Sequence, residues 1–302
     1  MYNEVLGPEV FGMQLIKFHG LGNDYLVLES SEIGVSPEMV IALCERHTGV
    51  GADGVLEVVE SRVADFGVVI HNPDGTQAEK SGNGLRIFSR YLVKYRSAAS
   101  DLTVETPAGV VRCRVDGDLV EVEMGGATVD PARIPAESHV IPLNLGAGFP
   151  SQAFAVGMGN PHCVVFLDVD FESVDWRAAG KALEVDPRFP NRTNVQFVRL
   201  IEGDQEGYAV LEARIWERGA GETQSSGSSA SAVAAAAVRS GLCPDAHQFV
   251  IQMPGGSLHV YLDWGDFLPS NSEDLPVRIK GPVEEVCRFQ VSDAWLARVK
   301  AD

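Results

Sequence analysis

Two segments of the chain carry helical patterns of very different kinds. In the first, four apolar residues recur three or four positions apart: Leu85, Phe88, Leu92 and Tyr95. Arg86 and Arg90 lie between them, which predicts a helix that buries one face. The second segment, 230–238, is nearly all alanine, and a glycine shortly after it marks its end. An alanine helix is small on every side, so we expect it where backbones pack closely, such as the middle of a small barrel.

Short valine-rich segments separated by turn residues make up much of the remaining chain. This pattern predicts strands rather than further helices. The segments are LTVET, VVRCRV, LVEVEM, HCVVFL, QFVRL and HVYLDW. Together with the two helices they predict an α+β fold, in which curved, mostly antiparallel strands wrap around a central helix.

The chain also resembles itself at long range. Three pairs of segments occur in the same order and at similar offsets, which indicates a duplicated fold of two pseudo-symmetric halves. The pairs are VVIHNPDGTQAEKSGNG (68–84) with ARIWERGAGETQSSGSS (213–229), GLGNDYLVL (20–28) with GMGNPHCVVF (157–166), and the weaker GADGVLEVV (51–59) with RTNVQFVRL (192–200). Each half should contribute one sheet and one central helix.

The boundaries between the halves follow from proline content and from the last strand. Residues 131–142 contain three prolines and are predicted to cross between the halves. We therefore assign 1–136 to the N-terminal half, with 1–12 as an extension of unknown role, and 137–277 to the C-terminal half. The segment GPVEEVCRF reads as a strand that returns to the first half, so 278–302 should complete it.

The composition of the chain indicates which kinds of binding partner are not expected. The chain has 302 residues, 45% of them hydrophobic, and a formal net charge of −18. Such an acidic protein is not expected to bind nucleic acid or an anionic membrane surface. No apolar run reaches transmembrane length, and the N-terminus lacks the basic region of a signal peptide. Five cysteines without metal-finger spacing fit reduced core residues of a cytoplasmic protein.

A serine-glycine pair precedes each predicted helix, at Ser81 and Gly82 and again at Ser226 and Gly227. The first N–H groups of a helix lack partners and its dipole favours negative charge, while glycine lets a ligand approach the backbone. Two such helix starts from related halves could hold one small carboxylate between symmetric walls. The alternative is ordinary capping of the helices by serine.

Other polar residues in or near the repeated motifs could each have a functional or a structural role. Asn23 and Asn160 end Gly-x-Gly-Asn loops, where they either bind a ligand or stabilise turns. His162 is either a strand residue of the core or an acid–base group. Glu217 and Arg218 form either a surface pair or a clamp in which the arginine binds a carboxylate.

Taken together, these motifs resemble the diaminopimelate epimerase family over nearly the whole chain from Met13 to about Cys287. The matching segments are KFHGLGNDYLVL, CERHTGVGADGVL, HNPDGTQAEKSGNGLR, TPAG, GMGNPHCVVF, FPNRTNVQFV and WERGAGET. The resemblance implies two pseudo-symmetric barrel-like halves. It also implies a cofactor-independent isomerase that converts LL-diaminopimelate to the meso form, for lysine and peptidoglycan synthesis. The enzyme would be cytoplasmic and would bind a small amino-acid substrate, and members of the family are often homodimers.

The resemblance also implies roles for individual residues. Four asparagines would bind the substrate, namely Asn23, Asn72, Asn160 and Asn194. Glu217 and Arg218 would hold its two ends or its reacting centre. Donors to the α-carboxylate would come from Gly82, Asn83, Gly227 and Ser228. His162 would lie near the acid–base pair.

At two positions the chain departs from the family pattern. The family places a cysteine before each glycine, where one thiolate removes the α-proton and the opposite thiol returns one to the other face. Ser81 and Ser226 stand there in this chain. A thiol titrates at about 8.5, and a helix N-terminus lowers that value. A hydroxyl in the same setting stays protonated and needs a partner base. Lys80 and His162 are candidates for that base, the alternatives being a solvated lysine and a structural histidine.

Three explanations of the serines remain open from the residues alone. The chain is an epimerase whose two cysteines have been replaced by engineering, a homologue that uses a single base such as Lys80 or His162, or a catalytically silent relative. In all three the asparagine, glutamate and arginine residues predict that binding of a dicarboxylic amino acid survives. Our expectation is a diaminopimelate epimerase whose activity is limited by serine at both base positions.

Overall fold

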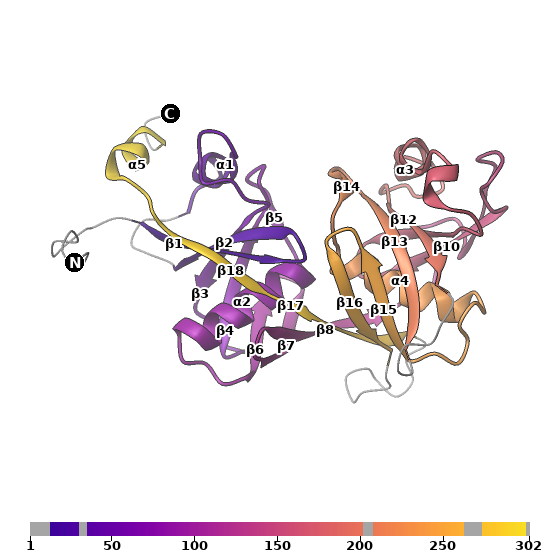
Figure 1. Cartoon of the computed structure of the whole chain (residues 1–302). Coiled ribbons are helices and arrows are strands. Elements are labelled where there is room, and N and C mark those ends of the chain that lie inside the picture. Colours follow the sequence, from indigo (N-terminus) through magenta and orange to yellow (C-terminus); the bar gives the residue numbers. More distant parts are fainter. Residues whose placement is uncertain (1–12, 30–34, 202–207, 263–273, 300–302) are drawn as a thin grey trace, which may run out of the picture.

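We describe a computed structural model of the chain, which covers residues 13–29, 35–201, 208–262 and 274–299. Two lobes of similar design lie side by side, each a curved sheet with one helix at its centre (Figure 1). The expected α+β fold is therefore confirmed. The predicted extension at 1–12 lies outside the described residues.

The N-terminal lobe contains the first strands and two helices. Its strands are β1 (Gln14–Gly20), β2 (Asn23–Glu29), β3 (Val55–Val59), β4 (Phe66–His71), β5 (Gln77–Ala78), β6 (Asp101–Thr106), β7 (Gly109–Asp116) and β8 (Leu119–Ala127). Its helices are α1 (Pro37–Cys44) and α2 (Gly82–Tyr95).

The C-terminal lobe repeats this order. Its strands are β9 (Val140–Pro142), β10 (Gln152–Gly157), β11 (Pro161–Phe166), β12 (Asn194–Leu200), β13 (Ala209–Glu217), β14 (Gly221–Thr223), β15 (Gln248–Met253), β16 (Gly256–Tyr261) and β17 (Leu275–Pro282). Its helices are η1 (Phe171–Ser173), α3 (Trp176–Glu184) and α4 (Gly227–Arg239). The chain then adds β18 (Glu284–Gln290) and α5 (Asp293–Val299).

Strand pairing shows the duplication directly. In the first lobe the strands lie in the order β1-β2-β3-β4-β6-β7-β8, with β2–β3 and β4–β6 parallel. In the second the order is β10-β11-β12-β13-β15-β16-β17, with β11–β12 and β13–β15 parallel. The parallel pairs fall at corresponding places, so both halves follow one topology.

Two long segments tie the halves together. Strands β8 and β17 pair antiparallel where the lobes meet. After β17 the chain runs on into β18, which pairs with β1 of the other lobe, as the yellow ribbon in Figure 1 shows. In the second lobe, Thr128 just after β8 forms a bridge with Gly157 at the end of β10. Each half is thus closed by backbone that continues from the other half. The exact boundaries at 136 and 277 stay predictions.

Both central helices are buried, α4 as its pattern predicted and α2 more deeply. Residues 230, 232 and 234–237 of α4 are alanines with no exposed surface, so the alanine helix does lie in the middle of its half. In α2 the predicted apolar face is buried, but Arg86 on the expected polar side is also fully buried. Burial of one face only is therefore wrong for α2, because strands surround the helix. No helix in the described ranges is long and apolar enough to cross a membrane.

Candidate active site

The N-termini of α2 and α4 meet where the two halves join. A methyl group placed on Gly227 would lie 3.4 Å from the Cα of Gly82. Methyl groups on either glycine would lie 2.9 Å from Cδ1 of Ile279, which belongs to β17. The two helices therefore direct their unpaired N–H groups and the positive ends of their dipoles toward one region. We call Gly82 and Gly227, with the serines before them, the paired N-termini.

Both serines cap their helices. The Ser81 hydroxyl accepts a hydrogen bond from the backbone N–H of Gly84 at 3.0 Å, and the Ser226 hydroxyl accepts one from Ser229 at 3.4 Å. Ser226 also lies 3.4 Å from the hydroxyl of Ser228. The capping reading is thus confirmed by geometry. It is compatible with a ligand site, because a cap satisfies one N–H group and leaves the others near the terminus available.

Tyr25 is the neighbour of Ser81 on the N-terminal side. Its hydroxyl lies 3.2 Å from Oγ of Ser81. Burial raises the pKa of Tyr25 to about 12, so this phenol is protonated at neutral pH, and either hydroxyl can donate in its contact with Ser81. Among the hydrogen bonds of the described residues, none connects either capping hydroxyl to a basic side chain. Activation of these serines as bases therefore has no evident partner in this part of the chain.

Asn83 links the two halves beside the paired N-termini. Its Nδ2 donates to Oδ1 of Asn23 at 3.1 Å and lies 3.4 Å from the carbonyl oxygen of Ser225. Oδ1 of Asn83 is buried and has no hydrogen-bond partner among the described residues. A buried acceptor of this kind is costly unless something bonds to it. It suits a ligand N–H group such as an ammonium.

Asp53 is a site residue to which the sequence assigned no role. Its carboxylate accepts a hydrogen bond from Nδ2 of Asn23 at 2.8 Å and pairs with Arg46 at 2.6 Å. Arg46 also binds Asp24 at 2.8 Å. This charged cluster fixes the amide of Asn23, whose two ends are both bonded to protein. The aspartate lies in the segment GADGVL, which carried the family resemblance without a function for that residue.

A buried polar chain leads from Asn160 to the second capping serine. Nε2 of His162 lies 2.9 Å from Oδ1 of Asn160, and Nδ1 lies 3.0 Å from the amide nitrogen of Gln196. Because an amide nitrogen only donates, Nδ1 accepts and Nε2 carries the proton. Gln196 also donates to the hydroxyl of Ser229 at 3.0 Å, and the backbone N–H of Ser229 in turn donates to the hydroxyl of Ser226, the N-cap of α4.

These hydrogen bonds and the burial of the ring determine the protonation state of His162. Burial, with a contribution from the positive charge of Arg218, lowers the pKa of His162 to about 3. The ring is therefore neutral at physiological pH, and both nitrogens are bonded to amides. Its Nε2–H holds the amide oxygen of Asn160, whose amide nitrogen has no hydrogen-bond partner among the described residues. Gln196 had no sequence signal beyond its place in a strand, because an inward-pointing polar residue shows only once the barrel is closed.

Replacing His162 should remove part of the acid sensitivity of the fold. The histidine titrates near 6.5 when unfolded and near 3 when folded, so the unfolded chain binds the extra proton between these values. Stability is retained above the unfolded pKa and is lost as pH falls toward the folded one. Urea unfolding of the parent and of H162Q should show the parent's advantage shrinking by about 2 kcal/mol between about pH 7 and about pH 4.5. A difference independent of pH would contradict a neutral His162.

Glu217 is the last residue of β13, and Arg218 follows it directly. Glu217 accepts a hydrogen bond from Thr223 at 2.7 Å. Burial raises the pKa of Glu217; the hydrogen bond from Thr223 lowers it, and the negative charge of Asp53 raises it further. Since Asp53 belongs to the other half, its charge acts on Glu217 across the join. A cationic ligand group between them would relieve their repulsion.

Arg218 is exposed but its backbone is fixed. Its N–H group donates to Oδ1 of Asn194 at 3.0 Å, and its guanidinium donates to the carbonyl oxygen of Asn191 at 2.9 Å. Nδ2 of Asn194 is bonded to the carbonyl oxygen of Pro161 at 3.1 Å. Asn194 therefore has both ends occupied by protein and holds Arg218 in place, while the guanidinium keeps donors free for a ligand.

Lys80 and Asn72 have their own partners. Nζ of Lys80 donates to the carbonyl oxygens of Glu123 and Met124 on β8, at 3.2 and 2.9 Å. Burial lowers the pKa of Lys80 to about 8, with Cys113 and Glu123 opposing the shift. Asn72 closes a tight turn by donating to the hydroxyl of Thr76 at 3.0 Å. No hydrogen bond of the described residues joins either side chain to the capping serines.

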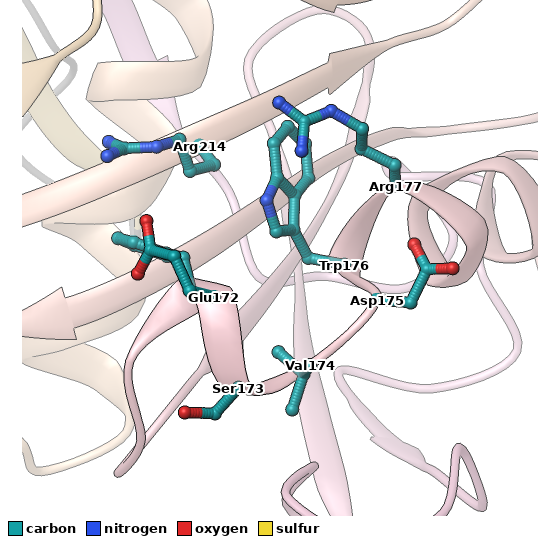
Figure 2. Close-up of a pocket in the computed structure, with 8 residues that line it drawn as sticks. Glu172, Ser173, Val174, Asp175, Trp176, Arg177 and Arg214 are labelled. Carbon is teal, nitrogen blue, oxygen red and sulfur yellow. The ribbon is translucent and has the colours of Figure 1, made fainter.

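A surface cavity of about 510 Å³ lies elsewhere in the C-terminal lobe, beside η1 and α3 (Figure 2). Its two cations already have carboxylate partners: Arg177 pairs with Glu222 at 2.6 Å and Arg214 with Glu212 at 2.8 Å. Arg177 also stacks on the ring of Trp176, with 4.4 Å between guanidinium carbon and ring centre. Of the residues that line it, only Arg214 lies in a repeated motif, and none is a candidate site residue, so we leave the cavity outside the candidate site.

Comparisons with known proteins show the family and the fold of the chain. A family model described as diaminopimelate epimerase matches residues 15–129 and 154–264. The chain is 40% identical over 260 residues to diaminopimelate epimerase 2 of Nostoc sp., covering 83% of this chain and 88% of that protein. It is 36% identical over 293 residues to diaminopimelate epimerase of Pelotomaculum thermopropionicum, covering 91% and 97%.

A solved structure with the same fold is the probable proline racemase from Agrobacterium radiobacter. The two chains superpose with a TM-score of 0.66 at 17% identity, covering 93% of each. At this level of identity the likeness establishes the fold, two pseudo-symmetric halves, and leaves the ligand to be argued from the residues.

Proposed function

Because the chain belongs to the diaminopimelate epimerase family, we propose that it binds LL-diaminopimelate between Ser81 and Ser226 and inverts one α-carbon very slowly. The observation that carries this proposal is the meeting of the paired N-termini, where a methyl group on Gly227 would lie 3.4 Å from the Cα of Gly82. Two helix starts at that spacing suit one carboxylate, which each would approach with backbone donors.

The polar residues around the paired N-termini match the remaining groups of the ligand. The α-carboxylate takes N–H groups near Gly82, Asn83, Gly227 and Ser228. The α-ammonium lies near the free Oδ1 of Asn83 and the carboxylate of Glu217. The distal end meets Arg218 and the amide nitrogen of Asn160. Asn23, Asn194 and His162 act indirectly, by holding these groups in place.

The chemistry of inversion requires a proton to leave one face of the α-carbon and another to arrive on the opposite face. As the C–H bond breaks, its electron pair passes toward the carboxylate, where the helix dipoles stabilise the growing negative charge. Ser81 and Ser226 flank this position, but hydroxyls hold their protons at neutral pH. The reaction therefore proceeds far more slowly than with thiols, while binding is retained.

The two substitute bases fit this reaction less well. Both nitrogens of His162 are bonded to amides, and Nζ of Lys80 is bonded to two carbonyl oxygens of β8. Either would have to give up these partners to take an α-proton. We therefore keep, as the second candidate, a silent relative that binds a dicarboxylic amino acid without turning it over. The site would be the same.

A single experiment separates these candidates. The protein is incubated with LL-diaminopimelate in D₂O, the α-proton is followed by NMR, and binding is measured by calorimetry. We expect measurable binding and exchange over hours to days. L-Lysine serves as the matched control ligand, since it lacks one carboxylate and should bind at least about tenfold more weakly. Binding without exchange selects the silent relative, and absence of binding overturns the proposal.

The setting of the reaction follows from the same family membership. We place it in the cytoplasm, in the synthesis of lysine and peptidoglycan precursors, without a cofactor and in a homodimer. Size-exclusion chromatography with light scattering tests the assembly directly.

A further inference from the structure

Arg86 is a buried cation for which the described residues offer no partner. It lies one helical turn after Gly82 on α2 and has no exposed surface. Its Nε, Nη1 and Nη2 atoms form no hydrogen bond within the described ranges. A guanidinium has five N–H donors, and burying it unpaired is strongly unfavourable. Because burial of this unpaired guanidinium is unfavourable, we looked for a role of Arg86 other than packing.

The guanidinium packs against the backbone of Gly20 and Gly281, at the end of β1 and in β17. A methyl group on Gly20 would lie 2.9 Å from Nη2 of Arg86, and one on Gly281 would lie 3.5 Å from its Cζ. The carbonyl oxygen of Gly20 accepts a hydrogen bond from Ser225 at 3.3 Å, and Ser225 is in turn a neighbour of Asn83. One peptide group therefore separates the cation from the Asn83–Ser225 contact that joins the halves.

The charge of Arg86 is little compensated by its surroundings. Burial alone lowers its pKa to about 10, so the side chain stays protonated at neutral pH. The other cations of this helix region are engaged elsewhere: Lys80 donates to β8, and Arg90 pairs with Asp118 at 2.7 Å. In surroundings of low dielectric, an unscreened charge acts over a longer range than it would in water.

We propose that Arg86 is a positioning residue whose buried charge raises the positive potential at the paired N-termini and so favours an anion there. Helical side chains lean toward the N-terminus, and Arg86 lies about 7.5 Å along the axis from residue 81. Its charge adds to both helix dipoles at the point where they meet. The inference rests on the proposed function only for the identity of the anion, which would be the α-carboxylate and its reacting form.

The test uses an anion built into the protein, so that it does not depend on any ligand. S81C introduces a thiol at the N-cap of α2, and its pKa is read from the pH dependence of alkylation at that position, resolved by mass spectrometry. In the S81C background, R86M should raise this pKa by roughly one unit, that is, about tenfold less thiolate. R86K keeps the charge and should restore most of the effect.

R90M in the S81C background is the matched control, because it removes a cation from the same helix that is partly exposed and paired. It should leave the thiol pKa unchanged. An unchanged pKa in R86M, or equal shifts in R86M and R86K, would overturn the proposal in favour of a packing role. If R86M does not fold, comparison of R86K with R86Q decides the same point. A thiol pKa that follows the charge, in a protein that binds no diaminopimelate, would uphold this inference while the proposed function fails.

Discussion

Replacing both capping serines with cysteine is expected to raise α-proton exchange of LL-diaminopimelate by on the order of a thousandfold or more. The double variant S81C/S226C places a thiol at each paired N-terminus, where the helix dipole and the cap hydrogen bonds from Gly84 and Ser229 favour the thiolate. A thiolate removes the proton from one face, and the opposite thiol supplies one to the other. Exchange in D₂O and formation of the meso isomer would both be followed by NMR.

The single variants are the controls for this prediction. S81C and S226C alone each provide one base and no partner acid of matching strength, so each should fall well short of the double variant. If the double variant folds and binds the ligand but remains as slow as the parent, serine identity is not what limits the reaction. The substrate would then be a different amino acid.

The second large effect is expected at Gly255, in the turn between β15 and β16. A methyl group there would lie 2.0 Å from the carbonyl oxygen of Leu21, a backbone atom of the other half. Leu21 itself has φ of 58°, so its loop has little freedom to yield. G255A should therefore cost about 3 kcal/mol of unfolding free energy and weaken ligand binding, because Asn23 is two residues from Leu21. Urea unfolding and calorimetry measure the two effects.

The duplicated fold supplies a matched control for this change. Ala108 occupies the corresponding turn between β6 and β7, where its N–H group donates to Glu79 as that of Gly255 donates to Gln224, at 3.3 and 2.9 Å. Ala108 is exposed, so A108G should change stability by about 1 kcal/mol or less. Equal effects of the two variants would show that the contact between the halves at Leu21 is not what makes glycine necessary.

The sequence predicts the fold well because both central helices and the duplication leave local traces. Helical spacing after Gly84, an alanine run after Ser229 and matched Gly-x-Gly-Asn loops are all features of short segments. The starts of the two helices were also predictable, since serine before glycine is a strong N-terminal signal. What these patterns could not give is the depth of burial, and so Arg86 was expected on a polar face.

Residues that orient other site residues are harder to predict from the sequence than residues that would contact the ligand themselves. Gln196 and Asp53 each orient another side chain, and both lie more than 20 residues along the chain from the group they hold, His162 and Asn23. Contacts of that kind arise from strand pairing and leave no periodic signal. The amides of Asn23 and Asn194 were equally hard to predict. Both ends of each amide are hydrogen-bonded to other protein groups, and the sequence shows the amide but not those partners.

The exchange of strands between the halves has a consequence for how the protein is made. β1, one of the first elements synthesised, pairs on one side with β18, which is among the last. Gly281, against which Arg86 packs, and Ile279, which the paired N-termini contact, likewise come from the final segment of the chain. The N-terminal half therefore stays an open sheet until β17 and β18 have been synthesised, and the paired N-termini lack Ile279 until then. Neither half is closed without backbone from the other, so neither is an autonomous unit.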